Sequence, residues 1–166
     1  MHNTDAPEIY VLPIEEQLPV FIDQHRDILM LMLDGLTEQE ARTSLVPSRT
    51  TLLGLVKHAT FVERVWFAEA ATGKTRAELG IVSGPDESFI LDPSDTITSV
   101  LSGYEAAVEQ SRAAVAGLSL TDELPGNRRG PLPLGWVYLH VLRELAQHCG
   151  HAEILREQIL ASRASL

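Results

Sequence analysis

A carboxylate and two imidazoles lie where an amphipathic helix would normally carry apolar side chains. Glu144 and His148 are four residues apart near the C-terminus, so on a helix they point the same way, about 40° apart around the axis. The stripe that contains them is otherwise aliphatic and consists of Leu134, Val137, Val141, Glu144, His148, His151, Leu155 and Ile159. Burying an unpaired charge on such a face is costly, so these groups need a partner. We predict that the partner is a divalent metal.

A third candidate ligand, His58, lies within another apolar stripe earlier in the chain. That stripe consists of Leu52, Leu55, His58, Val62, Val65 and Glu69. If its helix packs beside the C-terminal helix at the usual separation of about 8–10 Å, the His58 imidazole reaches a metal held by Glu144 and His148. Glu63, five residues after His58, points about 140° away and is not expected to join them.

Two histidines and one carboxylate leave a coordination position open, which is typical of catalytic rather than structural zinc. The same set is also used at non-haem iron, so the ligand types alone do not identify the metal. The alternative interpretation is a polar network without a metal. It remains open at this point because Glu-x-x-x-His pairs are common on solvated helices, and a histidine on an apolar stripe is often a hydrogen-bonded core residue.

Three neighbours of these candidates are interpreted from their positions on the same helix. His151 lies one turn beyond His148 and is a candidate for orienting a ligand or carrying a proton, or else a polar residue at the mouth of a pocket. Cys149 lies about 100° around the axis from His148, so it is predicted to be a packed core thiol rather than a catalytic partner. His140 is rotated about 80° from His148 and is predicted to have a structural or surface role.

The spacing of apolar residues predicts an all-α protein, a four-helix bundle in a single domain over residues 1–166. The long helices are predicted over residues 16–34, 50–72, 92–117 and 134–162, with a short helical turn over 37–44. Asp92 followed by Pro93 is typical of a helix N-terminus, and Gly35 and Gly73 stand where glycines end helices.

The remaining segments are predicted to be irregular. Residues 1–13 are expected to form an extended lead-in, because Pro7 and Pro13 oppose helix there. The connections over 73–92 and 117–133 show no alternation typical of strands and are predicted as loops, one of them a long crossover connection.

Composition and charge narrow the class of protein. The chain has 166 residues, of which 13 are basic and 23 acidic, for a formal net charge of −10. This charge disfavours nucleic acid and anionic membranes as partners, and no aliphatic run approaches the roughly 20 residues of a membrane span. Cys149 is the only cysteine and the N-terminus has no features of a signal peptide, so a cytoplasmic protein is expected. His25, Arg26 and Asp27 are predicted to form a solvated patch, and Met30 with Leu31 indicates a face for a homodimer.

The two segments that carry the candidate ligands resemble the DinB/YfiT-like superfamily, in particular its branch of mycothiol-dependent enzymes. They are TTLLGLVKHATFVERVW over residues 50–66 and RELAQHCGHAEILRE over residues 143–157. The resemblance extends from about Pro13 to Ile159. It implies a four-helix bundle that holds a divalent metal through His58, Glu144 and His148. Many members of the superfamily have histidine at the position of Glu144, and the glutamate matches the ligand set of the mycothiol-dependent maleylpyruvate isomerase.

The resemblance also implies a reaction. A thiol beside a divalent cation loses its proton more readily, and the thiolate is the nucleophilic form of sulfur. The implied activity is therefore metal-dependent S-transfer of a low-molecular-weight thiol, mycothiol or bacillithiol, to a small electrophile, or isomerisation through a transient thiol adduct. Zinc is the expected metal, with nickel or iron as alternatives.

Two other functions remain open. The first is a metal-dependent hydrolase in which the metal activates water and His151 or a loop carboxylate acts as the base. The second is a protein that is not an enzyme but binds small molecules or acts in a stress response. In that case the metal would be structural and His151 would be the natural fourth ligand.

Overall fold

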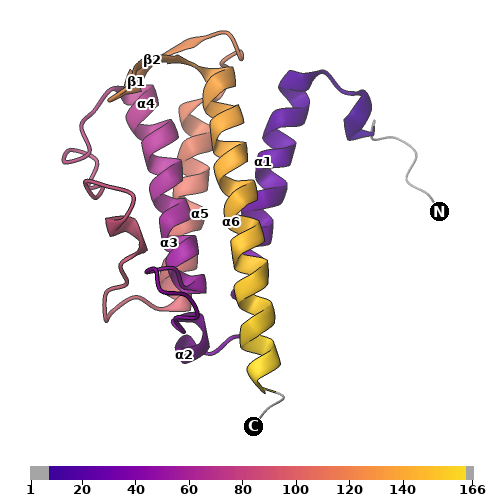
Figure 1. Cartoon of the computed structure of the whole chain (residues 1–166). Coiled ribbons are helices and arrows are strands. Elements are labelled where there is room, and N and C mark those ends of the chain that lie inside the picture. Colours follow the sequence, from indigo (N-terminus) through magenta and orange to yellow (C-terminus); the bar gives the residue numbers. More distant parts are fainter. Residues whose placement is uncertain (1–7, 164–166) are drawn as a thin grey trace.

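The structure is a computed structural model that describes residues 8–163 (Figure 1). Its long helices are α1 (Ile14–Leu31), α3 (Leu52–Glu63), α5 (Ile97–Ala114) and α6 (Leu134–Arg163), and α3 continues through the π-helical segment η2 (Arg64–Glu69) into α4 (Ala70–Thr72). The short elements are the turns η1 (Ile9–Val11), α2 (Glu38–Ala41) and η3 (Glu87–Phe89) and the strands β1 (Glu123–Asn127) and β2 (Gly130–Pro133). The predicted all-α four-helix bundle is confirmed. That residues 1–166 form one domain stays a prediction.

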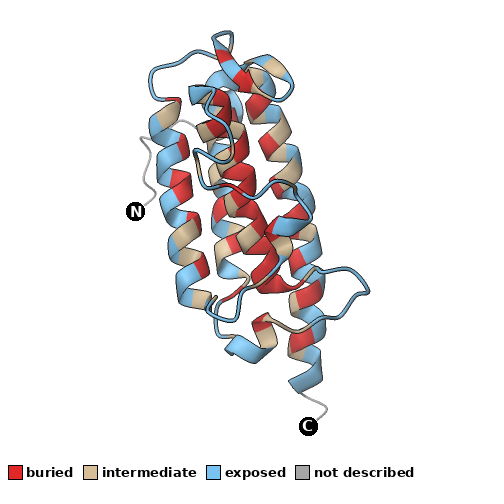
Figure 2. Cartoon of the chain, turned by 90° about the vertical axis from the view of Figure 1, so that its left-hand side faces the viewer, coloured by how far each residue is buried: buried red, intermediate tan, exposed pale blue. Residues whose placement is uncertain are grey.

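The helix α3 is largely buried within the bundle. It packs against both α5 and α6, while α1 packs against the other side of α6. All residues of α3 except Lys57 and Thr60 are buried, and Figure 2 shows that the buried residues of the other long helices lie mainly on the sides that face the interior of the bundle. Because α3 and α6 are direct neighbours, side chains from their facing sides can meet in the core. Within residues 8–163, none of the helices has both the length and the apolar character needed to cross a membrane.

The start of α5 differs from the prediction at Asp92. The helix begins at Ile97, and Thr96 is its N-cap in a capping box with Ser99. Asp92 lies in the preceding turn, where its carboxylate is 3.0 Å from the Lys57 ammonium. The Asp-Pro pattern was therefore wrong as a helix start, because the aspartate pairs with a lysine of α3 instead of capping a helix.

The second connection contains a small β-hairpin, which the sequence analysis did not predict. Leu124 of β1 pairs with Leu132 of β2 in antiparallel register. Gly126 requires glycine, since its φ is +85° and a Cβ there would lie 1.7 Å from the Gly130 carbonyl oxygen. The hairpin closes the end of the bundle at which α4 stops and α6 begins.

The N-terminal region also differs in detail. The lead-in contains the turn η1, so it is not fully extended, and residues 1–7 lie outside the described part. The helix α1 begins at Ile14 and includes Pro19, whose missing N–H removes one helical hydrogen bond. Gly35 and Gly73 have φ values of +67° and +66° and follow helix ends as predicted.

Candidate metal centre

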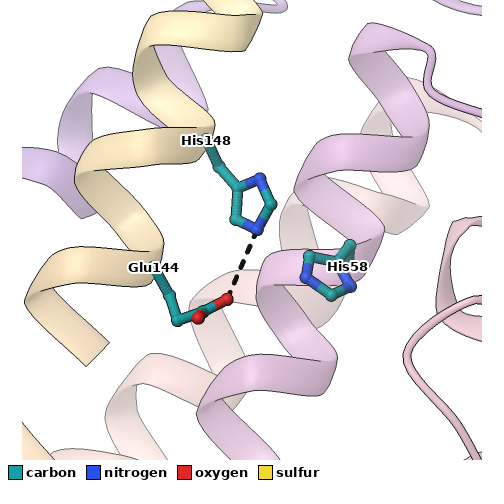
Figure 3. Close-up of side chains that lie close together, drawn as sticks. All are labelled: His58, Glu144 and His148. Carbon is teal, nitrogen blue, oxygen red and sulfur yellow. Dashed lines mark ion pairs between the residues drawn. The ribbon is translucent and has the colours of Figure 1, made fainter. Parts of the chain in front are cut away.

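The three predicted ligands come together between α3 and α6. Figure 3 shows His58 on α3 facing Glu144 and His148 on α6. One ligand atom from each of the three lies within 4.8 Å of the others. The Nε2 atom of His148 is 3.7 Å from a Glu144 carboxylate oxygen, and the two imidazole rings are nearly perpendicular, with centroids 4.7 Å apart. The arrangement follows from sequence spacing, because Glu144 and His148 are one helical turn apart on the face of α6 that meets α3.

The orientation of the His58 ring is fixed by the short turn η3. Nδ1 of His58 lies 2.7 Å from the hydroxyl of Ser88, and this hydroxyl donates its single proton to the carbonyl oxygen of Pro85 at 2.5 Å. Ser88 must therefore accept from His58, which places the imidazole proton on Nδ1 and leaves a lone pair on Nε2. The next residue, Phe89, stacks on the same ring with centroids 4.1 Å apart.

Both imidazoles are uncharged at neutral pH. Burial lowers the pKa of His58 to about 3, and the neighbouring His148 contributes to this shift. Burial likewise lowers the pKa of His148 to about 4, with a further contribution from His151. Neutral imidazole is the form that binds metals, so neither group has to lose a proton before binding an ion.

Glu144 lies at the edge of the site and remains partly accessible. Its side chain is 29% exposed and lies 3.8 Å from Nε2 of His140 and 3.9 Å from the guanidinium of Arg143. His140 stacks in parallel on Trp136 and also contacts Trp66. This packing holds the imidazole beside a candidate ligand, and the structural or surface role of His140 stays a prediction.

His151 is close to the site but outside the group of potential ligands. Its ring centroid is 5.9 Å from that of His148, and its side chain is exposed. It lines a cavity of about 250 Å³ together with Ser48, Thr50 and Leu155. Both roles considered for His151, a proton carrier and a polar residue at the mouth of a pocket, stay predictions.

Cys149 and Glu63 both lie away from the site, as predicted. Cys149 is 5% exposed and its thiol donates to the backbone oxygen of His25 on α1, and burial raises the pKa of this thiol to about 11, with Glu153 as a smaller cause. Glu63 is fully buried and binds Arg26 through both carboxylate oxygens. Arg26 is thus a core residue, and its predicted place in a solvated patch was wrong.

Ser88 and Phe89 were not predicted to belong to the site. Both lie in the connection over 73–92, where no helical periodicity relates them to His58. The only available signal was that long connections in compact domains often contribute to binding sites. Their contacts become visible only when the connection folds back across α3.

A divalent metal fits the three residues that meet here. The donors are two neutral imidazole nitrogens and one carboxylate, a set that zinc and iron sites use. Nδ1 of His58 is already hydrogen-bonded, so its Nε2 is the atom free to bind an ion. Such outward hydrogen bonds on the second nitrogen are usual for histidines that bind metals. By contrast, Nδ1 of His148 is buried without a hydrogen-bond partner among residues 8–163.

Comparisons with known proteins agree with this architecture. A family model described as mycothiol-S-transferase matches residues 17–161. Among solved structures, the fold is similar to that of a mycothiol-dependent maleylpyruvate isomerase in which one histidine is replaced by alanine, with a TM-score of 0.60 and 16% sequence identity. The match covers 87% of this chain and 62% of the isomerase chain, so this chain spans less than two thirds of its length. No curated protein sequence matches significantly. The predicted resemblance to the DinB/YfiT-like superfamily and its mycothiol-dependent branch is confirmed.

Proposed function

Since this chain belongs to the mycothiol-S-transferase family, we propose that it transfers a low-molecular-weight thiol, mycothiol or a close analogue, to a small electrophile. We further propose that the reaction depends on a divalent metal held by His58, Glu144 and His148. The observation that carries this proposal is the convergence of these three side chains between α3 and α6, with ligand atoms within 4.8 Å of one another.

The charges of the three residues suit thiol chemistry. A divalent ion bound here would lower the pKa of a thiol beside it and so favour the thiolate at neutral pH. The two imidazoles are neutral, and Glu144 provides one negative charge, so the set offsets only half of the charge of a divalent ion. A thiolate can offset the rest. The Glu144 side chain is partly exposed, so this edge of the site is in contact with solvent.

The transfer requires a group that accepts the proton of the thiol. The sulfur forms a bond to the electrophilic carbon, and a leaving group departs with its bonding electron pair. We propose that His151 accepts the thiol proton, because it lies one turn from His148 at the rim of a cavity open to solvent. We also propose zinc as the metal, with nickel or iron as alternatives, and the cytoplasm as the location.

Metal content tests the proposal most directly. Elemental analysis of protein purified without a metal-affinity tag should find about one divalent ion per chain, and His148→Ala should lose it. His25→Ala is the matched control, since His25 lies on α1 and bonds the Phe21 carbonyl oxygen. Conjugation of mycothiol to a fluorogenic haloalkane should fall more than about a hundredfold in His148→Ala, because even residues that only orient metal ligands contribute about 10–100-fold.

The same assays separate the rival functions. A metal-free wild type that takes up neither zinc nor nickel would refute the metal centre. Turnover of an ester or amide that needs the metal but no thiol would favour a hydrolase. A structural metal in a binding protein would require a fourth protein ligand, whereas His151 lies outside the group of potential ligands.

A further inference from the structure

A second cavity lies beside α3, adjacent to the candidate metal centre. Its volume is about 660 Å³, and it is a partly open cleft lined by residues of α3, by Arg64 at the start of η2, by α5 and by the segment over residues 80–95. The α3 residues that line it, such as Lys57 and Phe61, are about 60–100° around the helix from His58. None of the three candidate metal ligands lines this cavity. Cavities of this size are typical of sites for small molecules, which occupy about 300–1,000 Å³.

The walls of the cavity combine apolar side chains with polar and charged ones. They include the side chains of Phe61, Ile81, Val82, Ile90 and Val100. Phe61 and Ile81 belong to a small hydrophobic cluster separate from the main core, so the cavity has an ordered apolar floor. A ligand that fills it would therefore present an apolar surface to these side chains.

Of the charged groups that line the cavity, Lys57 pairs with Asp92 and Asp95, whereas Glu87 and Arg64 form no ion pair with any residue from 8 to 163. The Lys57 ammonium is 2.7 Å from Asp95 and 3.0 Å from Asp92, and it also donates to the Ile90 carbonyl oxygen. Glu87 accepts from the hydroxyl of Ser83. Arg64 forms no ion pair or side-chain hydrogen bond with any residue from 8 to 163 and lines the cavity. Its guanidinium remains available to a carboxylate.

A glycine keeps the cavity open on the α5 side. Gly103 lies inside that helix and lines the cavity. Glycine costs about 1 kcal/mol relative to alanine in a helix, and usually a positive φ or a close approach of other atoms explains its presence. Neither applies here: its φ is not positive, and an added Cβ would meet nothing within 4 Å. The missing side chain leaves free volume that a ligand can occupy.

From these observations we propose that the cavity is a second small-molecule site, which binds an amphipathic carboxylate with its apolar body between α3 and α5 and its carboxylate on Arg64. The site goes beyond the proposed transferase function and does not depend on it. It adjoins the metal centre at Ser88, which lines the cavity and accepts from Nδ1 of His58, and at Phe61, whose ring stacks on the His58 imidazole with centroids 5.9 Å apart. The ligand therefore lies on the side of His58 away from the face that meets Glu144 and His148.

Binding of 2-naphthoate, with 2-naphthamide as the uncharged comparator, tests the proposal by calorimetry. The wild type should bind naphthoate saturably and the amide at least about tenfold more weakly, as loss of a charge-assisted hydrogen bond predicts. Arg64→Gln should weaken naphthoate binding by a similar factor. Arg128→Gln is the matched control, because Arg128 is exposed in the hairpin and does not line the cavity.

A steric variant tests the location independently. Gly103→Leu should abolish binding by filling the cavity, while Gly103→Ala should retain it, and both should stay folded because the added Cβ has free space. Removing metal with a chelator should leave the affinity unchanged. The proposal would be overturned if the wild type showed no saturable binding of naphthoate. It would also be overturned if Arg64→Gln and Gly103→Leu bound naphthoate as tightly as the wild type, or if removing the metal abolished binding. The metal and conjugation assays remain the separate test of the transferase function.

Discussion

A serine outside the helices determines which nitrogen of His58 carries a proton. Ser88 is 3% exposed, and its hydroxyl proton is already given to Pro85, so only its lone pairs face the imidazole. His58 is therefore held in the tautomer that keeps Nε2 free toward Glu144 and His148. Without this acceptor the ring would lose both its orientation and its preference between tautomers.

Ser88→Ala should weaken metal binding about 10–100-fold, the usual cost of removing a group that orients a metal-binding histidine. Competitive titration with a chromophoric chelator measures the affinity, and ¹⁵N chemical shifts of the imidazole report the tautomer without any assay of activity. A mixture of tautomers in the metal-free variant is the expected signature of lost positioning.

Ser102→Ala provides the control for Ser88→Ala, since Ser102 is exposed on α5. Its metal affinity and tautomer should equal those of the wild type. If Ser88→Ala also matched the wild type in both measurements, the hydrogen bond to His58 would have no positioning role.

At the scale of elements, Gly54 allows η3 to pack closely on α3. A Cβ at Gly54 would lie 3.0 Å from the Thr51 hydroxyl oxygen and 3.1 Å from the Phe89 carbonyl oxygen. Gly54 is one turn before His58, so the close approach is what lets Ser88 and Phe89 reach the imidazole. A methyl group there would push the turn away from α3.

Gly54→Ala should therefore lower both stability and metal affinity, even though alanine favours helix by about 1 kcal/mol. Gly103→Ala is the matched comparison and should raise the free energy of unfolding by about that amount, since nothing contacts its added Cβ. Urea unfolding compares the two variants. If Gly54→Ala and Gly103→Ala stabilised the protein equally, the close packing of η3 on α3 would not depend on the glycine at position 54.

The limits of the sequence analysis appear at this scale. Glu144 and His148 were predictable because one turn of helix fixes their relation, and His58 because its stripe had to face the core. Neither the late start of α5 nor the contact of Ser88 was predictable. Asp92 is held by Lys57, and Ser88 by His58. Such long-range contacts leave no periodic signal in one sequence.

Across the whole molecule, a buried ion pair joins α1 to α3. Arg26 donates to both carboxylate oxygens of Glu63, at 2.8 and 2.7 Å, and also to Asp23. Asp23 in turn binds Arg112 of α5 at 3.0 Å. The network therefore connects three helices around the side of α3 that faces away from the candidate metal centre. Its partners are far apart in sequence, which is why Arg26 was predicted to be solvated.

Arg26→Met should destabilise the protein by about 3–5 kcal/mol, because it leaves the Glu63 carboxylate buried and unpaired. Combining it with Glu63→Leu should recover most of the loss, since an apolar pair of similar volume is often as stable as a buried ion pair. Urea unfolding measures both variants. Arg112→Met, which removes a more exposed partner, should cost only about 0–1 kcal/mol.

If Arg26→Met lowered the free energy of unfolding only slightly, water or protonation would be compensating for the unpaired charge of the buried Glu63 carboxylate. Failure of the double variant to recover would mean that the ion pair is needed for packing as well as charge. The two outcomes separate electrostatic from steric contributions to the bundle.

The burial of Cys149 has a consequence for resistance to oxidation. It is the only cysteine of the chain, and its sulfur is covered by the packing of α6 on α1 and remains protonated at neutral pH. Mixed disulfides form by attack of an exposed thiolate. Cys149 is therefore protected from this reaction both by its burial and by its protonated state. A protein that uses a soluble thiol under the function proposed above would then resist being trapped as a disulfide with that thiol.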